Sequence, residues 1–128
     1  MRRGGNVAIL TKPFTTEKLK NVLEFLKYYD LSDAVCKEKI EVSDALLKEF
    51  CKKHLQDNAV RRQNVLHIFD YIDNETDKEL LRRRYIDNQD YYDIAYEMGY
   101  CDRYMMKLYK KAFDRLVKTA ENMPEFEY

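Results

Sequence analysis

The twenty residues from Gly99 to Lys118 concentrate basic side chains in a chain that has no net charge. They contain six Lys and Arg against two Asp, with an apolar residue at about every third or fourth position. On a helix of 3.6 residues per turn, this spacing separates a basic side from an apolar side. The basic side holds Arg103, Lys107, Lys110, Lys111, Asp114 and Lys118, and the apolar side holds Cys101, Met105, Leu108, Tyr109, Ala112 and Leu116.

Long cationic side chains on one helix face can neutralise phosphates and reach base edges, so the pattern predicts contact with duplex DNA. We expect Arg103 to contact base edges, because its planar guanidinium can form two hydrogen bonds with guanine. Lys107 is expected to contact a base or a phosphate, and Lys110 and Lys111 to contact phosphate. Tyr104 is expected to contact a thymine methyl group or a phosphate, with packing on the preceding helix as the alternative.

Two further side chains complete the predicted contact set. Met106 flanks the basic side of the helix, and Arg83 belongs to a second basic cluster, Arg82 to Arg84. One arginine of that cluster is expected to contact phosphate, whereas Arg84 has pairing with Asp87 or Asp90 as an alternative. For every residue of the set, the competing interpretation is an ordinary solvated helix surface.

Metal, cofactor and enzyme chemistry find little support in the sequence. Cys51 and His54 have the spacing of a zinc ligand pair and His67 follows, but a structural zinc site requires four ligands and no second close pair exists. No Gly-rich phosphate loop and no nucleophile elbow accompany these residues. We therefore expect no metal, no cofactor and no enzymatic activity.

Composition favours an all-α protein. Of 128 residues, 45% are hydrophobic and 36% charged, while Gly 3 and Pro 2 leave few turns and helix breaks. Zero net charge argues against a polycation that coats nucleic acid, but is compatible with a local basic face. Three scattered cysteines, with no apolar run long enough for a signal peptide or a membrane span, predict a cytoplasmic protein without a membrane partner.

The front of the chain predicts four helical segments. The first begins after Thr15 or Thr16 as N-cap, with an apolar stripe that includes Leu19 and Leu26; the others cover 32–40, a stretch starting at Ser43, and 59–72. The breaks near Val42 and Asn58 are weak, so neighbouring segments could form one longer helix.

The back of the chain predicts a short helix, a tight turn and a longer basic helix. Thr76 or Asp77 is expected to cap a helix over 78–86, and Asp90 to cap one over 91–98, after a turn in which Asn88 tolerates a left-handed backbone. Gly99 supplies the next turn, and the last helix runs over 102–119. With a small residue, Ala95, where the helices cross, this order is typical of a helix-turn-helix, whose second helix enters the major groove.

The segment "LLRRRYIDNQDYYDIAYEMGYCDRYMMKLYKKAFDRL" resembles the C-terminal part of phage-encoded ArpU/RinA-like transcriptional regulators, and more broadly the region 4 helix-turn-helix of sigma-70 factors. The positions that match are Arg84, Tyr85, Ile86, Ile94, Ala95, Met98, Gly99, Tyr100, Lys107, Leu108, Ala112 and Leu116. Departures include Asn88 for Gly, Asp90 for Ser, and Cys101 for the serine that caps the recognition helix. Asp102 is the candidate to replace that cap.

The resemblance implies a sequence-specific, double-stranded DNA-binding regulator of phage, prophage or mobile-element transcription that reads the major groove with helix 102–118. The alternative is a helical protein that binds RNA polymerase or another protein, sigma-like or anti-sigma-like, without its own operator. The predicted organisation is a flexible arm over 1–13, a helical region over 14–75, the helix-turn-helix over 76–120 and a fraying acidic tail over 121–128. A homodimer through residues 14–75 is a further expectation.

Overall fold

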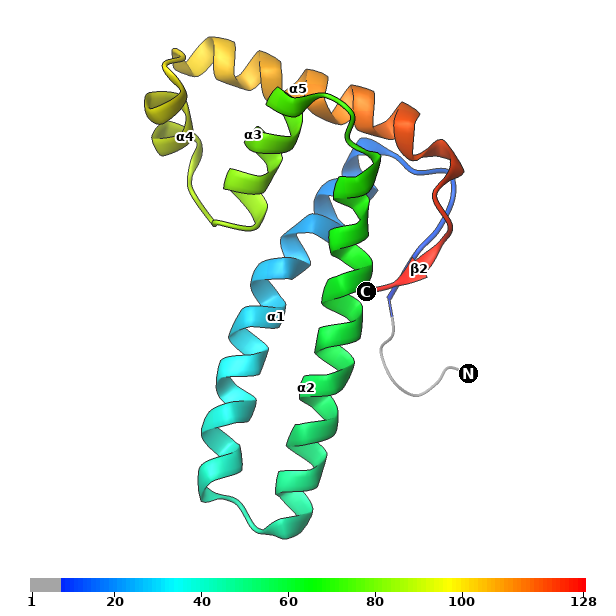
Figure 1. Cartoon of the computed structure of the whole chain (residues 1–128), viewed down its shortest axis with the longest axis vertical. Coiled ribbons are helices and arrows are strands. Elements are labelled where there is room, and N and C mark those ends of the chain that lie inside the picture. The colour runs from blue at the N-terminus through cyan, green and yellow to red at the C-terminus, as the bar shows by residue number, and fades with distance from the viewer. Residues whose placement is uncertain (1–7) are drawn as a thin grey trace.

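The computed structural model describes residues 8–128. Its described part is built from five α-helices, two short 3-10 helices and two very short strands, which confirms the predicted all-α class (Figure 1). No helix within it is long and apolar enough to cross a membrane. The elements are β1 (Ile9–Leu10), α1 (Thr16–Val42), α2 (Ala45–Leu66), η1 (His67–Tyr71), α3 (Glu75–Tyr85), α4 (Tyr91–Met98), α5 (Asp102–Thr119), η2 (Ala120–Asn122) and β2 (Phe126–Glu127).

The front of the chain forms one long antiparallel hairpin, α1 and α2, instead of four segments (Figure 1). As predicted, Thr15 caps the first helix, and its hydroxyl accepts a hydrogen bond from the Lys18 backbone N at 3.2 Å. The helix then continues to Val42. Asp44, rather than the predicted Ser43, caps the second helix by accepting from the Leu47 backbone N at 3.0 Å.

Polar residues join the two helices, and one of them, Asn58, stands at a break that the sequence suggested. The Asn58 amide donates to Ser32 Oγ at 3.2 Å and to Asp33 at 2.9 Å, and Arg62 donates to Asp30 and Asp33, each at 2.9 Å. Burial acts to raise the pKa of Asp33, but the hydrogen bonds from Asn58 and Arg62 outweigh it and lower that pKa. Because each polar group has a partner on the other helix, neither helix has to end there.

A single hydrophobic core joins the base of the hairpin to the three following helices. Its α1 face contains the predicted stripe of Leu19, Val22, Leu23 and Leu26, and the end of α2 with η1 contributes the predicted Val65, Ile68, Phe69 and Ile72. These residues meet Leu81 and Tyr85 of α3, Ile94 of α4, and Met105, Phe113 and Leu116 of α5. The core therefore fixes α5 across the end of the hairpin, where Figure 1 shows it as the outermost helix.

The two ends of the described chain are paired. β1 runs antiparallel to β2, with Ile9 opposite Glu127 and Leu10 opposite Phe126, and Met123 is only 1% exposed. The prediction that residues 121–128 fray is therefore wrong, because their apolar side chains complete the core. Of the predicted flexible arm, residues 1–7 lie outside the described residues, and the remainder packs against the C-terminal strand.

Candidate nucleic-acid interface

The turn between α4 and α5 follows directly from local sequence. Asp90 starts α4 by accepting a hydrogen bond from the Asp93 backbone N at 2.9 Å, and Asn88 before it has a left-handed φ of 58°, both as predicted. Gly99 ends α4 with φ 78°, and the Tyr100 N–H closes the turn on the Ala95 carbonyl at 2.8 Å. Ala95, at the crossing, is 2% exposed. The bounds of α4 and α5 match those predicted.

The N-terminus of α5 lacks a side-chain cap. Cys101 occupies the N-cap position and makes no capping hydrogen bond, and the predicted replacement by Asp102 is wrong because Asp102 is already the first helical residue. The first turn of α5 therefore presents unpaired backbone N–H groups beside its basic side chains. Such a terminus carries a partial positive charge.

A buried carboxylate ties α3 to α5. The N-cap of α3 is Asn74, not the predicted Thr76 or Asp77, and its side chain accepts from the Asp77 backbone N at 3.1 Å. Asp77 itself is 2% exposed and accepts two hydrogen bonds from Arg115, at 2.6 and 2.7 Å. The hydrogen bond from Arg115 to Asp77 is the main reason that the pKa of Arg115 is raised. The pair holds α5 against α3 at the flank of its exposed face.

Aromatic rings pack together on the buried side of α5. The Tyr85 and Tyr109 hydroxyls share a buried hydrogen bond, and the Tyr109 ring meets Tyr91 edge-on at 4.9 Å and Phe113 at 5.1 Å. Burial raises the pKa of Tyr85 to about 12 and also raises that of Tyr109. Both phenols therefore stay neutral at physiological pH, and the layer under α5 adds no negative charge.

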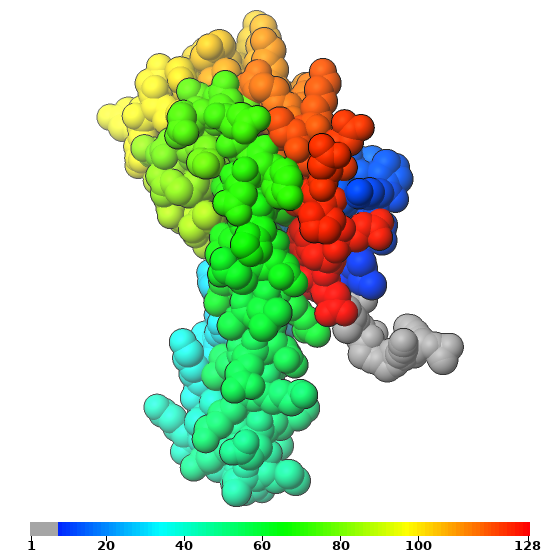
Figure 2. Space-filling model, turned by 45° about the vertical axis from the view of Figure 1, so that its right-hand side comes forward, coloured from blue at the N-terminus to red at the C-terminus, as the bar shows by residue number. Residues whose placement is uncertain are grey.

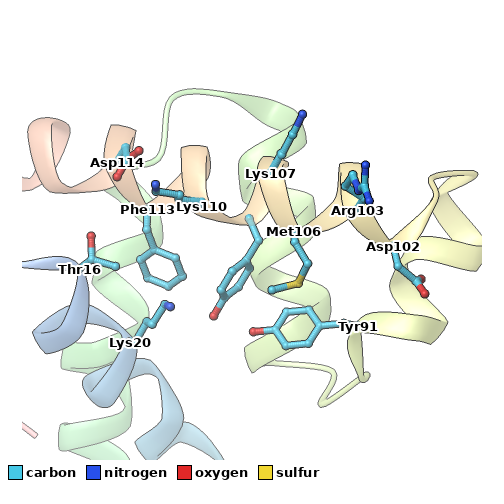
Figure 3. A pocket seen from close by; sticks show the side chains of 11 residues that line it. Thr16, Lys20, Tyr91, Asp102, Arg103, Met106, Lys107, Lys110, Phe113 and Asp114 are labelled. Carbon is cyan, nitrogen blue, oxygen red and sulfur yellow. The ribbon is translucent and has the colours of Figure 1, made fainter.

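The outer face of α5 gathers exposed cations without acidic partners. Arg103, Lys107, Lys110 and Lys111 are all exposed, and none forms an ion pair within residues 8–128. Figure 3 shows Arg103 and Lys107 projecting away from the molecule, on the outer side of the helix. Their charge is therefore free to meet an external anion.

A groove of about 990 Å³ runs beside this face, between α5, the start of α4 and the first turns of α1. Met106 is 51% exposed and points into it together with Tyr91 and Phe113 (Figure 3). Lys20 of α1 reaches the same groove, with its Nζ 5.1 Å from the centre of the Tyr109 ring and 5.5 Å from that of Phe113. The fold thus adds to the groove one cation that the sequence did not predict.

Lys20 lies more than eighty residues before α5 and next to the core residue Leu19. Its place in the groove depends on how α1 docks on α5, for which no local pattern exists. No sequence signal could have identified it.

The two remaining side chains of the predicted contact set, Tyr104 and Arg83, interact with other residues of the protein. Tyr104 is 48% exposed, and one edge of its ring packs against Tyr100 at 5.1 Å. Arg83 forms ion pairs with Glu79, at 2.6 Å, and with Glu97. Its charge is already neutralised, so we leave Arg83 out of the interface.

The neighbours of Arg83 are also engaged. Arg82 pairs with Glu79 and Asp87, whereas Arg84 stacks over the Tyr91 ring at 4.6 Å and donates to the Gln89 carbonyl. Of the two partners predicted for Arg84, Asp87 pairs with Arg82 and Asp90 caps α4. The second basic cluster is therefore a structural network that orders the turn before α4.

The candidate metal ligands also have local partners. His54 Nε2 lies 3.0 Å from Ser32 Oγ, and His67 Nδ1 lies 3.1 Å from Asp70. In the part of the chain that the structure describes, no three His, Cys, Asp or Glu side chains come together to hold a metal ion.

Comparisons with known proteins identify no relative of this chain. No family model matches the chain, and searches of the curated proteins and of the solved structures found no significant match.

Proposed function

We propose that the chain binds double-stranded DNA in a sequence-specific manner and regulates transcription of phage, prophage or mobile-element genes. In this proposal α4, the turn at Gly99 and α5 act as a sigma-region-4-like helix-turn-helix, with α5 in the major groove. The observation that carries it is the outer face of α5, where Arg103, Lys107, Lys110 and Lys111 have no acidic partner among the described residues. The arginines of α3 are by contrast paired or stacked.

The first turns of α5 are expected to read bases. Arg103 and Lys107 lie in its N-terminal half, where a recognition helix usually meets base edges. Lys110 and Lys111, further along, are expected to contact phosphates and fix the position of the protein on the duplex. Tyr104 and Met106 flank this line and would supply apolar contact, for example with a thymine methyl group.

Fluorescence anisotropy with duplexes tiled across the gene's own neighbourhood tests the proposal. We expect one tile to bind far more tightly than the others, with a steep loss of affinity as salt rises. Arg103→Ala/Lys107→Ala should abolish that preference and change the log K against log[salt] slope little, because both side chains are expected to contact base edges. Lys110→Ala/Lys111→Ala removes the two expected phosphate contacts and should instead make the slope shallower by about 1.8, at about 0.9 per lost contact.

The matched control removes two exposed lysines elsewhere. Lys37→Ala/Lys52→Ala changes the net charge by the same amount on the polar side of the hairpin. It should retain both the preferred tile and most of the salt slope. Weak, sequence-blind binding by the wild type, or equal losses in this control and in Arg103→Ala/Lys107→Ala, would contradict the proposal.

A second candidate function is binding to RNA polymerase or another protein without an operator. The observation that favours it is the groove beside α5, with its half-exposed Met106 and aromatic lining, in a chain of zero net charge. Met106→Asp should then abolish polymerase co-purification, whereas Lys111→Ala should leave it intact. Under the DNA proposal, polymerase would not co-purify with the wild type or with either variant in the absence of DNA.

A further inference from the structure

The far half of the hairpin carries apolar side chains that the core does not cover. Seven large ones are more than half exposed there, among them Leu31 at 61% and Phe50 at 70%. The seven are Tyr28, Leu31 and Val35 before the turn, Val42 at the turn, and Leu46, Leu47 and Phe50 after it. Figure 2 shows this part of the hairpin extending beyond the rest of the molecule. The exposed apolar groups are thus concentrated in one region.

Five of these seven side chains share one side of the helix pair. Tyr28, Leu31 and Val35 follow one another at helical spacing on α1, and Leu47 and Phe50 do so on α2. All five line a single groove of about 700 Å³ between the two helices. The other side of the hairpin carries exposed polar residues, which include Lys37, Glu41, Lys52 and Gln56. The hairpin is therefore apolar on one side only.

The contact between α1 and α2 cannot absorb this surface. Between positions 30 and 58, only Cys36, Cys51 and Asn58 are buried, and the other bonds across the pair are polar. Two helices that hide so little of their apolar surface are marginal in water unless another layer covers them. The missing layer has to come from outside the described chain.

The charge and the size of this surface point to a second copy of the same chain. Residues 27–57 contain six Lys and Arg and seven Asp and Glu, so two hairpins neither repel each other nor select a strongly charged partner. Tyr28 and Phe50 each expose on the order of 100 Å², and seven such side chains approach the roughly 800 Å² per partner of a standard interface.

We infer that the protein forms a symmetric homodimer in which the apolar sides of two α1–α2 hairpins pack together as a four-helix bundle. Leu31, Val35, Leu47 and Phe50 form the centre of the contact. The surface lies at the opposite end of the molecule from α5 (Figure 1), so the inference does not depend on DNA binding.

Sedimentation velocity of the full chain, without DNA, tests the inference across about two decades of concentration in the micromolar range. We expect a reversible monomer–dimer equilibrium. Because Phe50 lies in the centre of the contact, Phe50→Asp should raise the dimer dissociation constant by at least about 30-fold. Val60→Asp is the matched control, since Val60 is 63% exposed on α2 but does not line the groove. It should leave the dissociation constant within about twofold.

Circular dichroism melting shows whether Phe50→Asp remains folded, and a cross-link locates the contact independently. Leu47→Cys in a Cys101→Ser background should give a covalent dimer with a short bismaleimide, whereas Val60→Cys should not. A wild type that stays monomeric throughout, a dimer that Phe50→Asp leaves unchanged, or a monomer that instead captures a different protein through this groove would each overturn the inference. Loss of DNA binding with an intact dimer would contradict only the proposed function.

Discussion

At the scale of single residues, the ion pair between Asp77 and Arg115 is markedly asymmetric. The Asp77 side chain is 3% exposed and the Arg115 side chain 45%. Arg115→Met leaves a carboxylate buried without its partner, and we expect a loss of about 2–4 kcal/mol in the free energy of unfolding. Asp77→Asn should cost less, because the released guanidinium can turn toward water. Urea unfolding of both variants measures the difference, and an equal or reversed order would contradict the argument.

Two buried phenols predict how stability depends on pH. Burial raises the pKa of Tyr29 and of Tyr85 to about 12, above the value near 10 of an unfolded tyrosine. Between these values the unfolded state loses protons that the folded state keeps. Stability should therefore be complete below pH 10 and fall toward pH 12, by up to about 1.4 kcal/mol per pH unit for each tyrosine.

Tyr29→Phe isolates one contribution to this pH dependence. The Tyr29 hydroxyl is buried without a hydrogen-bond partner within residues 8–128, so its removal should change stability at pH 7 by less than about 0.5 kcal/mol. The same variant should lose its share of the alkaline slope. Urea unfolding at several pH values from 8 to 11 provides the measurement. An unchanged slope would show that Tyr29 does not contribute.

At the scale of elements, the turn between α4 and α5 depends on one backbone conformation. Gly99 has φ 78°, and a Cβ at that position would meet no atom within 4 Å. Gly99→Ala should thus cost only the left-handed backbone penalty, about 1–2 kcal/mol, and Gly99→Asn less. Thermal melting of both variants tests this expectation. If the two cost the same, backbone strain is not the cause.

The elements that sequence predicted correctly are those defined by near neighbours. Asp90, Asn88 and Gly99 act within a few positions of themselves, so their types were enough to place α4 and the start of α5. Asp77 was misassigned as a cap because its partner, Arg115, is 38 positions away. Asn58 stood near a predicted break for the same reason, since its amide bonds to Ser32 and Asp33 on the other helix. The type of a polar residue alone does not distinguish a local partner from a distant one.

The residues of the candidate interface also separate into those that local sequence predicted and those that it did not. Helical spacing within 102–118 placed Arg103, Lys107, Lys110 and Lys111 on one exposed face, because a single helix determines that relation. Arg83 was expected to contact phosphate, but it pairs with Glu79, four positions earlier on the same helix, and with Glu97 of α4. The spacing to Glu79 is a local signal that the sequence does contain, whereas the pairing with Glu97 depends on how α3 and α4 pack.

At the scale of the whole molecule, the C-terminal residues belong to the core. Met123 is 1% exposed and packs in the same cluster as α1 and α5. Met123→Ala should lower the free energy of unfolding by about 2–4 kcal/mol through lost burial and a new cavity. Glu121→Ala, an exposed position two residues earlier, should cost less than about 0.5 kcal/mol. Chemical denaturation compares them, and a neutral Met123→Ala would mean that the tail frays after all.

The pairing of β1 with β2 also has a kinetic consequence. It joins segments far apart in the chain, as the bond from the Lys12 backbone N to Glu125, 113 positions away, illustrates. Closing so long a loop costs more entropy than forming the helical hairpin or the α3–α5 unit, so we expect the strands to come together after the helices have met. Contacts made after the transition state slow unfolding without speeding folding. We therefore expect these two strands of two residues each to lengthen the lifetime of the native state while adding little to the rate at which it forms.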